Sequence, residues 1–228
     1  MKIKAISLDL DETLWPVWPA IARAEQALHR FLETHAPATA AAYSPEQLRA
    51  LRDEVLAERP ELRHDIARIR LTAIGIALER TGHDSGLAAP AWDTFCDERQ
   101  RVEFYPGALA ALEWFASRYP LVALTNGNAD VARIGIGHHF RHAISAGEVG
   151  IAKPEAGIFL LACERLGCAP DEVLHVGDDA MLDIVGAKRA GLPAAWINAG
   201  GVPFPHAEPP DLEFVDVASL ARHLRATA

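Results

Sequence analysis

Cysteine is scarce in this sequence, and its few copies are not arranged in pairs. The three residues, Cys96, Cys163 and Cys168, show no Cys-x-x-Cys spacing and no even framework. This pattern argues against disulfides and is typical of reduced thiols in a cytoplasmic protein. Long apolar runs are also missing: no stretch approaches the ~18 apolar residues of a membrane span, and Asp9 interrupts the first run. We therefore expect a soluble, cytoplasmic protein with no signal peptide and no membrane partner.

Basic residues are scarce as well. The 22 Lys and Arg residues stand against 31 Asp and Glu, which gives a formal net charge of -9. This balance argues against a broad surface for the phosphate backbone of nucleic acid. It leaves room for a small anionic substrate, because a metal ion and a few local donors can override the overall sign. Half of the residues are hydrophobic, which is enough for a substantial core.

Short apolar runs with little alternation indicate strands that are covered on both faces. They occupy residues 3–8, 121–124, 142–145, 172–176 and 193–198, with a last short strand near 212–215. Helical segments are expected over residues 107–118, 155–166 and 180–190. Alternation of strands and helices predicts an α/β fold with a doubly wound parallel sheet.

A long stretch after the first strand carries helical patterns alone. Apolar residues recur at helical spacing in residues 19–35 and 61–82, and Ser44 with Gln47 forms a capping-box signature before another helix. We interpret this stretch as an inserted helical domain. The predicted organisation is a core of residues 1–16 and 100–228 and a helical insertion of residues 17–99.

Polar clusters follow the predicted strands at their carboxyl ends, where ligands bind in open parallel sheets. They are the segments Asp-Leu-Asp (9–11), Thr-Asn-Gly-Asn (125–128), Lys153 with its loop, and Gly-Asp-Asp-Ala-Met-Leu-Asp (177–183). The convergence of these clusters, more than any single motif, predicts the functional site.

Asp9 and Asp11 are two residues apart, so their side chains project to the same side of an extended chain. Two carboxylates this close resist joint ionisation unless a cation lies between them. Mg²⁺ suits the position, because it prefers oxygen ligands and keeps places for water and phosphate. Asp178 would add a further carboxylate. Taken alone, the motif fits equally well with Asp11 capping a turn and Asp178 capping a helix; the other clusters favour the metal site.

Thr125 and Lys153 are candidate ligands of an anion. Thr125 offers a hydroxyl beside the start of a helix, where free N–H groups favour an anion, and its alternative role is an ordinary N-cap. Lys153 would be the cation among the clustered carboxylates, although a single lysine is more often a surface residue. We expect Asp183 to support the metal site from outside its ligand shell. Asp179 would act in the same way or as a helix cap.

The motifs DLDETL, LTNGN, KP and GDDAMLD, in this order and spacing, resemble the four motifs of the haloacid dehalogenase-like hydrolase superfamily. The resemblance implies a Rossmann-like core, and the helical insertion is similar to the C1-type cap of that superfamily. The stretches ERPELRHDIARIR, YPLVALTNGNAD and EVLHVGDD resemble its branch of proteobacterial flavin mononucleotide and phosphoribitylaminouracil phosphatases. Nearly the whole chain takes part in this resemblance.

The resemblance implies a role for each matching residue. Asp9 would be the nucleophile that takes the phosphoryl group. Asp11 would protonate the leaving alcohol and then activate water. Asp9, the backbone carbonyl of Asp11, and Asp178 would hold Mg²⁺.

The remaining matches concern the phosphate and the cap. Thr125, Asn126 and Lys153 would bind the phosphate, and Thr13 would shape the loop that leads into the cap. Contacts to the rest of the substrate are expected, on weaker grounds, from aromatic and basic residues of the cap and its hinge, namely Trp15, Trp18, His64 and Arg68.

The predicted function, with the substrate taken from the resemblance, is a Mg²⁺-dependent phosphatase that acts through an aspartyl phosphate on a small metabolite such as flavin mononucleotide or phosphoribitylaminouracil. We expect it to be a monomer or homodimer. Sugar phosphates and nucleotides are alternative substrates, and a phosphomutase of the same superfamily is an alternative reaction. Dehalogenases need no acid at the second position, so Asp11 argues against them. A phospho-receiver module would place its acidic pair before a separate accepting Asp, and it has no place for an insertion of roughly 80 residues. A non-catalytic binding protein would not need every catalytic residue type.

Overall fold

The computed structural model describes residues 2–227, which divide into two compact units. The first unit, here called the sheet unit, combines Met1–Pro16 with Glu103–Ala228. The second, here called the helical unit, is the continuous stretch Val17–Val102. Within the described residues, no helix has the length and apolar character needed to cross a membrane.

The strands of the sheet unit form one parallel sheet in the order β3-β2-β1-β4-β5-β6. Their bounds are Ala5–Leu8 (β1), Leu121–Thr125 (β2), His142–Ser145 (β3), Val173–Gly177 (β4), Ala194–Ile197 (β5) and Leu212–Phe214 (β6). The order runs outward in one direction from β1 and in the other from β4. This reversal is the switch point of a doubly wound sheet, and its carboxyl end is where such folds bind ligands. The predicted α/β fold is confirmed.

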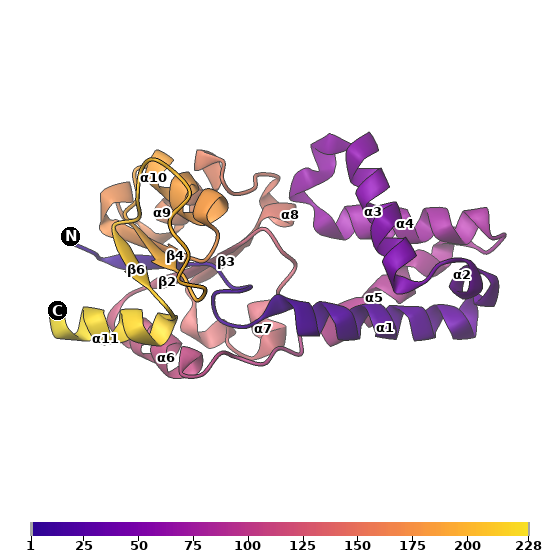
Figure 1. Ribbon diagram of the computed structural model, residues 1–228, viewed down its shortest axis with the longest axis horizontal. Helices are drawn as coiled ribbons and strands as arrows, with labels where there is room; N and C mark the ends of the chain where they lie inside the picture. The colour runs from indigo at the N-terminus through magenta and orange to yellow at the C-terminus, as the bar shows by residue number, and fades with distance from the viewer. Residues whose placement is uncertain (1, 228) are drawn as a thin grey trace. The chain divides into compact units, whose positions relative to one another are not determined.

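The central strands are buried throughout, because helices cover both faces of the sheet. Every residue of β1, β2, β4 and β5 is buried, which explains their continuous apolar sequences. Figure 1 shows α9 and α10 on one face of the sheet and α6 and α11 on the other. The helices of this unit are α6 (Ala108–Arg118), α7 (Val131–Ile134), α8 (Ala146–Val149), α9 (Ala156–Leu166), α10 (Gly186–Arg189) and α11 (Val217–Thr227), with the short turns η3 (Gly137–His139), η4 (Pro170–Glu172) and η5 (Ala180–Val185).

The predicted helix over residues 180–190 takes a different form in the structure. Its first part, η5, is a π-helical turn, and only its second part, α10, is α-helical. The N–H groups of both Asp183 and Ile184 donate to the carbonyl of Asp179, at 3.0 and 3.3 Å. The wider turn follows from this shared acceptor. The helical spacing of the sequence did not reveal it.

The helical unit packs its apolar residues into a core of its own. Its elements are α1 (Val17–His35), α2 (Pro37–Ala42), α3 (Pro45–Glu58), η1 (Pro60–His64), α4 (Ile66–Arg80), η2 (Ser85–Leu87) and α5 (Ala88–Arg99). In Figure 1, α1 and α5 run alongside each other and α3 lies next to α4. Leu32, Ala77 and Phe95, from three different helices, are fully buried in this core.

Two helix starts in this unit show what local sequence can predict. The capping box of α3 is present: Ser44 Oγ accepts from the Gln47 N–H, and the Gln47 side chain accepts from the Ser44 N–H. The next helix begins later than its apolar pattern suggests. Residues 60–64 form a 3₁₀ turn, and α4 begins at Ile66 because the Asp65 carboxylate accepts from the Arg68 N–H at 2.9 Å and caps it.

Candidate active site

The first strand leads directly into the two acidic residues. The N–H of Asp9 donates to the Val176 carbonyl at 2.9 Å, so the pairing of β1 with β4 continues one residue further. The chain then turns at Glu12, whose φ is +57° and whose N–H donates to the Trp15 carbonyl at 2.8 Å. The turn leaves Asp9 only 6% exposed. It also brings the Trp15 indole N–H to the Asp11 carboxylate, at 2.8 Å.

Lys153 joins two buried carboxylates. Its Nζ lies 2.5 Å from Asp9 Oδ1 and 2.6 Å from Asp183 Oδ1. The backbone of Lys153 is held by Asn126, which donates from Nδ2 to the Lys153 carbonyl at 2.9 Å and accepts the Lys153 N–H at Oδ1 at 2.8 Å. The predicted cation is therefore a buried member of the site. Asn126, predicted to bind phosphate, holds the lysine loop in this structure.

Burial and mutual charge shift the pKa values of these groups in opposite directions. Burial, together with the charges of Asp183 and Asp178, raises the pKa of Asp9 well above its usual range, and Lys153 opposes this rise. The Lys153 charge and the His175 hydrogen bond hold the pKa of Asp183 far below its usual value despite burial. The two carboxylates raise the pKa of Lys153, although its burial acts the other way. Lys153 is therefore a permanent cation beside Asp9.

Asp178 directly follows the last residue of β4, the strand that pairs with β1. The Thr13 hydroxyl lies 3.2 Å from Asp178 Oδ1 and 3.4 Å from Asp9 Oδ2, so it connects the two carboxyl groups. The backbone of Asp178 is fixed by Trp196, whose indole N–H donates to the Asp178 carbonyl at 2.7 Å. Burial and the Asp183 charge raise the pKa of Asp178 to about 7. This carboxyl group is thus near half ionisation at neutral pH without a further cation.

Asp183 and Asp179 are linked through the backbone of the π-helical turn. The Asp179 N–H donates to Asp183 Oδ2 at 3.0 Å, and Asp179 Oδ1 accepts from the N–H groups of Met181 and Leu182. Asp179 is thus the N-cap of η5, one of its two predicted roles. Gly177 makes room for this arrangement, because a Cβ at that position would lie 2.3 Å from Asp183 Cγ.

A buried polar pair continues the network beneath Asp183. His175 Nε2 lies 3.1 Å from Asp183 Oδ1, and His175 Nδ1 lies 3.0 Å from Ser7 Oγ. Ser7 and His175 are partners in the register of β1 and β4, and both are fully buried. Burial lowers the pKa of His175, and the hydrogen bond and charge of Asp183 act against this change. The signal for this pair in the sequence is a polar residue within each of two apolar strands.

Thr125 ends β2 and is 4% exposed. Its Oγ accepts from the Gly127 N–H at 2.9 Å, which fixes the turn that follows the strand. A pocket of about 290 Å³, partly open to solvent, is lined by Thr125 together with Leu10, Asn128 and residues at or after the ends of β2 and β3. The first two predicted phosphate-binding positions, Thr125 and Asn126, therefore both have local hydrogen-bonding roles.

The donor set of the site fits a magnesium ion. Asp9, Asp178 and Asp183 each offer a carboxylate oxygen, and these atoms all lie within 4.8 Å of one another. Oxygen ligands are what Mg²⁺ prefers. Burial, and then the charges of the neighbouring carboxylates, raise the pKa values of Asp9 and Asp178, and a bound cation would offset both effects. Asp183 belongs to this group, closer to the other carboxylates than the sequence suggested.

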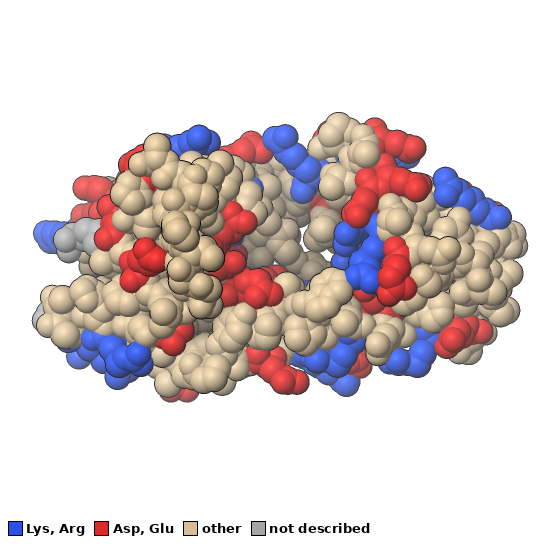
Figure 2. Space-filling model, in the orientation of Figure 1, with Lys and Arg blue, Asp and Glu red and all other residues tan. Residues whose placement is uncertain are grey.

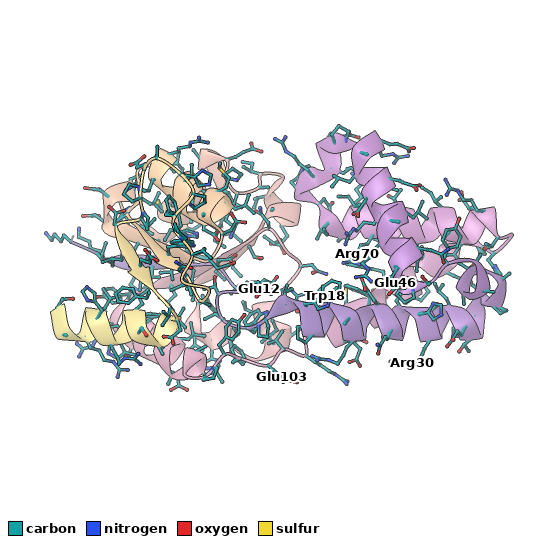
Figure 3. All side chains as sticks on the ribbon, viewed as in Figure 1. Glu12, Trp18, Arg30, Glu46, Arg70 and Glu103 are labelled. Atoms are coloured by element: carbon teal, nitrogen blue, oxygen red, sulfur yellow. The ribbon has the colours of Figure 1, made fainter. Side chains whose placement is uncertain are left out.

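The side chains predicted for substrate contact are divided between the two units. Trp15 lies in the sheet unit and is fully buried, so the structure does not offer it to a substrate. Trp18, His64 and Arg68 belong to the helical unit. The Trp18 ring is 55% exposed and carries the Arg49 guanidinium at 4.9 Å from its centroid. Figure 3 labels Trp18 near the start of α1.

Comparison with known proteins gives consistent matches along the chain. The family described as haloacid dehalogenase-like hydrolase matches residues 3–191. The chain is 36% identical over 205 residues to the 5-amino-6-(5-phospho-D-ribitylamino)uracil phosphatase of Escherichia coli K12, which covers 86% of this chain and 84% of that protein. It is 37% identical over 150 residues to the phosphoserine phosphatase of Thermus thermophilus, covering 63% of this chain and 60% of that protein.

A solved structure of similar sequence carries a different name. The 2-haloacid dehalogenase from Pseudomonas syringae pv. tomato is 36% identical to this chain and superimposes with a TM-score of 0.92. The match covers 99% of this chain and 100% of that one. Relatives of this chain therefore include proteins named as phosphatases and a protein named as a dehalogenase. The choice between these two reactions depends on the residues of the site.

Proposed function

The chain belongs to the haloacid dehalogenase-like hydrolase family, and from this premise we propose that it is a phosphatase that hydrolyses phosphate monoesters of small metabolites. The observation that carries the proposal is the buried cluster in which Lys153 lies between Asp9 and Asp183, with Asp178 beside them. Phosphate monoesters hydrolyse very slowly in water, and enzymes accelerate such reactions by up to ~10²¹. A fixed nucleophile beside a permanent cation suits such a barrier.

Asp9 is the proposed nucleophile. Its carboxylate attacks phosphorus and forms an aspartyl phosphate while the bond to the leaving oxygen breaks. Lys153 and Thr13 fix the orientation of the Asp9 carboxylate, and the Lys153 charge favours its ionised form. Fixing the attacking group in advance removes orientational entropy from the barrier.

Asp11 is the proposed acid and base. It gives its proton to the leaving alcohol in the first step. In the second step it takes a proton from the water that attacks the aspartyl phosphate, which releases phosphate and restores Asp9. The Trp15 indole N–H, at 2.8 Å, holds the Asp11 carboxylate in place for both transfers. Because Trp15 is fully buried, we propose that its role is to hold Asp11 and not to contact the substrate.

Lys153 and Thr125 are the proposed ligands of the transferring phosphate. Lys153 would bring positive charge to the equatorial oxygens, and Asn126 would support it by holding its backbone. When bound, Mg²⁺ would supply Lewis-acid stabilisation of the phosphoryl oxygens. Asp9, the backbone carbonyl of Asp11, and Asp178 are the residues proposed to hold it, and Asp183 would orient this set through Lys153 and the Asp179 N–H.

The proposed substrate is a phosphate ester of the flavin pathway, either flavin mononucleotide or 5-amino-6-(5-phospho-D-ribitylamino)uracil. The similarity to the Escherichia coli phosphatase over most of both chains supports this choice. Trp18, His64 and Arg68 of the helical unit are the side chains proposed to select the leaving group. Sugar phosphates, nucleotides and phosphoserine are the alternatives, and a phosphomutase reaction is the alternative chemistry.

The test is release of inorganic phosphate from a panel of these esters, with and without Mg²⁺. Wild type should release phosphate only with Mg²⁺ and should prefer the flavin-pathway esters. Asp9→Asn, measured in parallel, should release none while keeping its circular dichroism spectrum. Broad and weak release of phosphate would support the proposed reaction and contradict the proposed substrate. Absence of release from every ester would contradict the proposed function.

A dehalogenase is the second candidate, because the solved structure at 36% identity bears that name. Asp11 and the carboxylates around Asp9 speak against it, since displacement of a halide needs neither a proton donor nor a cluster of metal ligands. Chloride release from 2-chloropropionate in the presence of a chelator would favour this candidate. The expected location in the cytoplasm, and a monomeric or dimeric state, stay predictions.

A further inference from the structure

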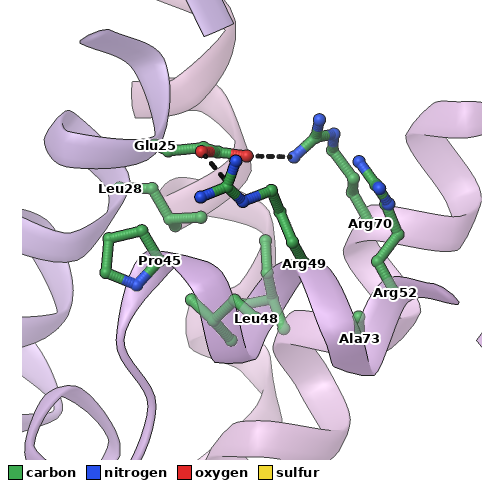
Figure 4. Close-up of a pocket in the computed structure, with 9 residues that line it drawn as sticks. Glu25, Leu28, Pro45, Leu48, Arg49, Arg52, Arg70 and Ala73 are labelled. Atoms are coloured by element: carbon green, nitrogen blue, oxygen red, sulfur yellow. Dashed lines mark ion pairs between the residues drawn. The ribbon is translucent and has the colours of Figure 1, made fainter. Parts of the chain in front are cut away.

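The helical unit contains a charged pocket that the proposed reaction does not use. The pocket lies among α1, α3 and α4; its cavity volume is about 20 Å³, and it is partly open to solvent. Its apolar wall includes Leu28 and Leu48. Figure 4 draws its charged members, one glutamate and three arginines: Glu25, Arg49, Arg52 and Arg70.

Glu25 is the carboxylate within this pocket, and its ion pairs are long. It is 5% exposed. Arg49 Nε lies 3.5 Å from Glu25 Oε2, and Arg70 Nη1 lies 3.6 Å from Glu25 Oε1. Charge-assisted hydrogen bonds between guanidinium and carboxylate groups are usually 2.7–2.9 Å long. Glu25 therefore attracts both arginines without taking up their N–H donors at close range.

The other carboxylates near these arginines are on the surface. Arg49 donates to Glu46 at 3.1 Å, and Arg52 donates to Asp53 at 2.7 Å. The side chains of Glu46 and Asp53 are 71% and 65% exposed. Exposed pairs of this kind contribute little energy and give way to a better-placed anion. Figure 2 shows basic side chains flanked by acidic ones in the region of the helical unit where Figure 3 labels Arg70 and Glu46.

Arg70 is the most enclosed of the three arginines. Its side chain is 11% exposed, and its guanidinium lies 4.5 Å from the centroid of the Phe95 ring. In Figure 4 the guanidinium groups of Arg52 and Arg70 lie near each other. Burial and then the Arg52 charge lower the pKa of Arg70 to about 10, so it remains a cation at neutral pH. The two neighbouring cations repel each other, and the Glu25 carboxylate offsets part of this repulsion.

We propose that this pocket is a binding site for an oxyanion group, the phosphate or carboxylate of a small metabolite. Arg52 and Arg70 would donate to its oxygens, and Arg49 would complete the set by turning from Glu46. Planar guanidinium groups present paired donors that match carboxylate and phosphate oxygens. Glu25 would remain inside as the fixed counter-charge that keeps the arginines ordered without the ligand. The proposal does not rest on the phosphatase reaction proposed above, although the pocket borders Trp18, whose ring carries the Arg49 guanidinium.

The experiment is an NMR titration of the full chain that follows the arginine Nε–Hε resonances. Inorganic phosphate is the first probe and citrate the second, both with a chelator present and with ionic strength kept constant by chloride. Resonances are assigned from the single variants. Because the readout belongs to named arginines, phosphate bound near Asp9 and Lys153 does not contribute to it.

We expect saturable shifts of the Arg49, Arg52 and Arg70 resonances with a dissociation constant in the millimolar range or below. Arg52→Gln should weaken binding at least tenfold. This side chain is 23% exposed, so its replacement should leave the fold intact. Arg30→Gln, on the exposed surface of α1 outside this pocket, should leave binding unchanged.

Saturation by phosphate alone would assign the site to phosphate-bearing metabolites, and saturation by citrate alone to carboxylates. Shifts that stay linear, that affect Arg30 equally, or that persist in Arg52→Gln would overturn the proposal and leave the cluster as a structural ion-pair network.

Discussion

The ammonium of Lys153 is enclosed by Asp9 and Asp183, and its side chain is only 3% exposed. Lys153→Met should therefore leave two buried carboxylates without their counter-charge. Loss of one partner from a buried ion pair costs roughly 3–5 kcal/mol of unfolding free energy. We expect a destabilisation of that size in urea unfolding and loss of phosphatase activity. Lys4→Met, which removes an exposed lysine paired with Glu172, should change stability far less. Equal effects of the two variants would contradict this prediction.

Asp178 should make the stability of the metal-free protein depend on pH. Its pKa is about 7 in the folded state against 3.8 for the ordinary group, so between these values the folded protein holds a proton that the unfolded chain has released. Stability from this group is thus present at low pH and is lost as pH rises through this window. Asp178→Asn removes the effect.

The measurement is the difference in melting temperature between Asp178→Asn and wild type, with a chelator, from pH 4 to pH 8. The variant should match wild type at the acid end and become increasingly more stable toward pH 7. Mg²⁺ should stabilise wild type more at pH 8 than at pH 5, because it binds the ionised carboxylate. A difference that stays constant over this range would show that Asp178 does not carry the shifted pKa.

Single residues also show where sequence reasoning stops. The clustering of Asp9, Lys153 and Asp178 could be predicted, because each follows a strand of a parallel sheet. The contacts of Ser7, His175 and Trp196 could not, because they lie in strands, where a side chain is normally read as core. Their pairings depend on which strands are neighbours and in what register, and no local pattern encodes that.

At the scale of elements, β4 and the π-helical turn after it are packed around a residue without a side chain. A Cβ on Gly177 would lie 2.3 Å from Asp183 Cγ, a distance that requires the turn to move. Gly177→Ala should therefore displace Asp183, destabilise the protein by about 1–3 kcal/mol and reduce activity. Urea unfolding and phosphate release measure the two effects.

Gly75 provides the matched control. It lies within α4, and a Cβ there would meet nothing within 4 Å. Gly75→Ala should stabilise the protein by about 0.5–1 kcal/mol, because alanine is the better helix former. If Gly177→Ala proved as harmless as Gly75→Ala, the close packing of the turn would be wrong.

Element boundaries were predictable where a local signal decides them. The strands agree with the apolar runs to within a few residues, and the Ser44 capping box places the start of α3. The apolar pattern predicts too early a start for α4, because Pro60 and Asp65 convert the first apolar turn into a 3₁₀ segment. The π-helical turn was missed because its cause is the shared Asp179 carbonyl, a backbone contact without a sequence pattern.

At the scale of the whole molecule, the sheet unit contains the candidate catalytic, phosphate-binding and metal-binding residues, and the helical unit contains the arginine pocket. The predicted insertion covers residues 17–99, and the helical unit of the structure is Val17–Val102. The role of this unit as a substrate-selecting cap stays a prediction. Asp9 links the proposed chemistry to the fold, since it directly follows β1 at the switch point of the sheet.

Phosphorylation of Asp9 during turnover is the step on which the proposed phosphatase reaction depends. It can be trapped by acid quenching of wild type within milliseconds of mixing with flavin mononucleotide and Mg²⁺, followed by borohydride reduction and peptide mapping. We expect a reduced aspartyl phosphate at Asp9 in wild type and none in Asp9→Asn. Phosphate release by the wild type without any modification of Asp9, or a modified residue elsewhere, would contradict it.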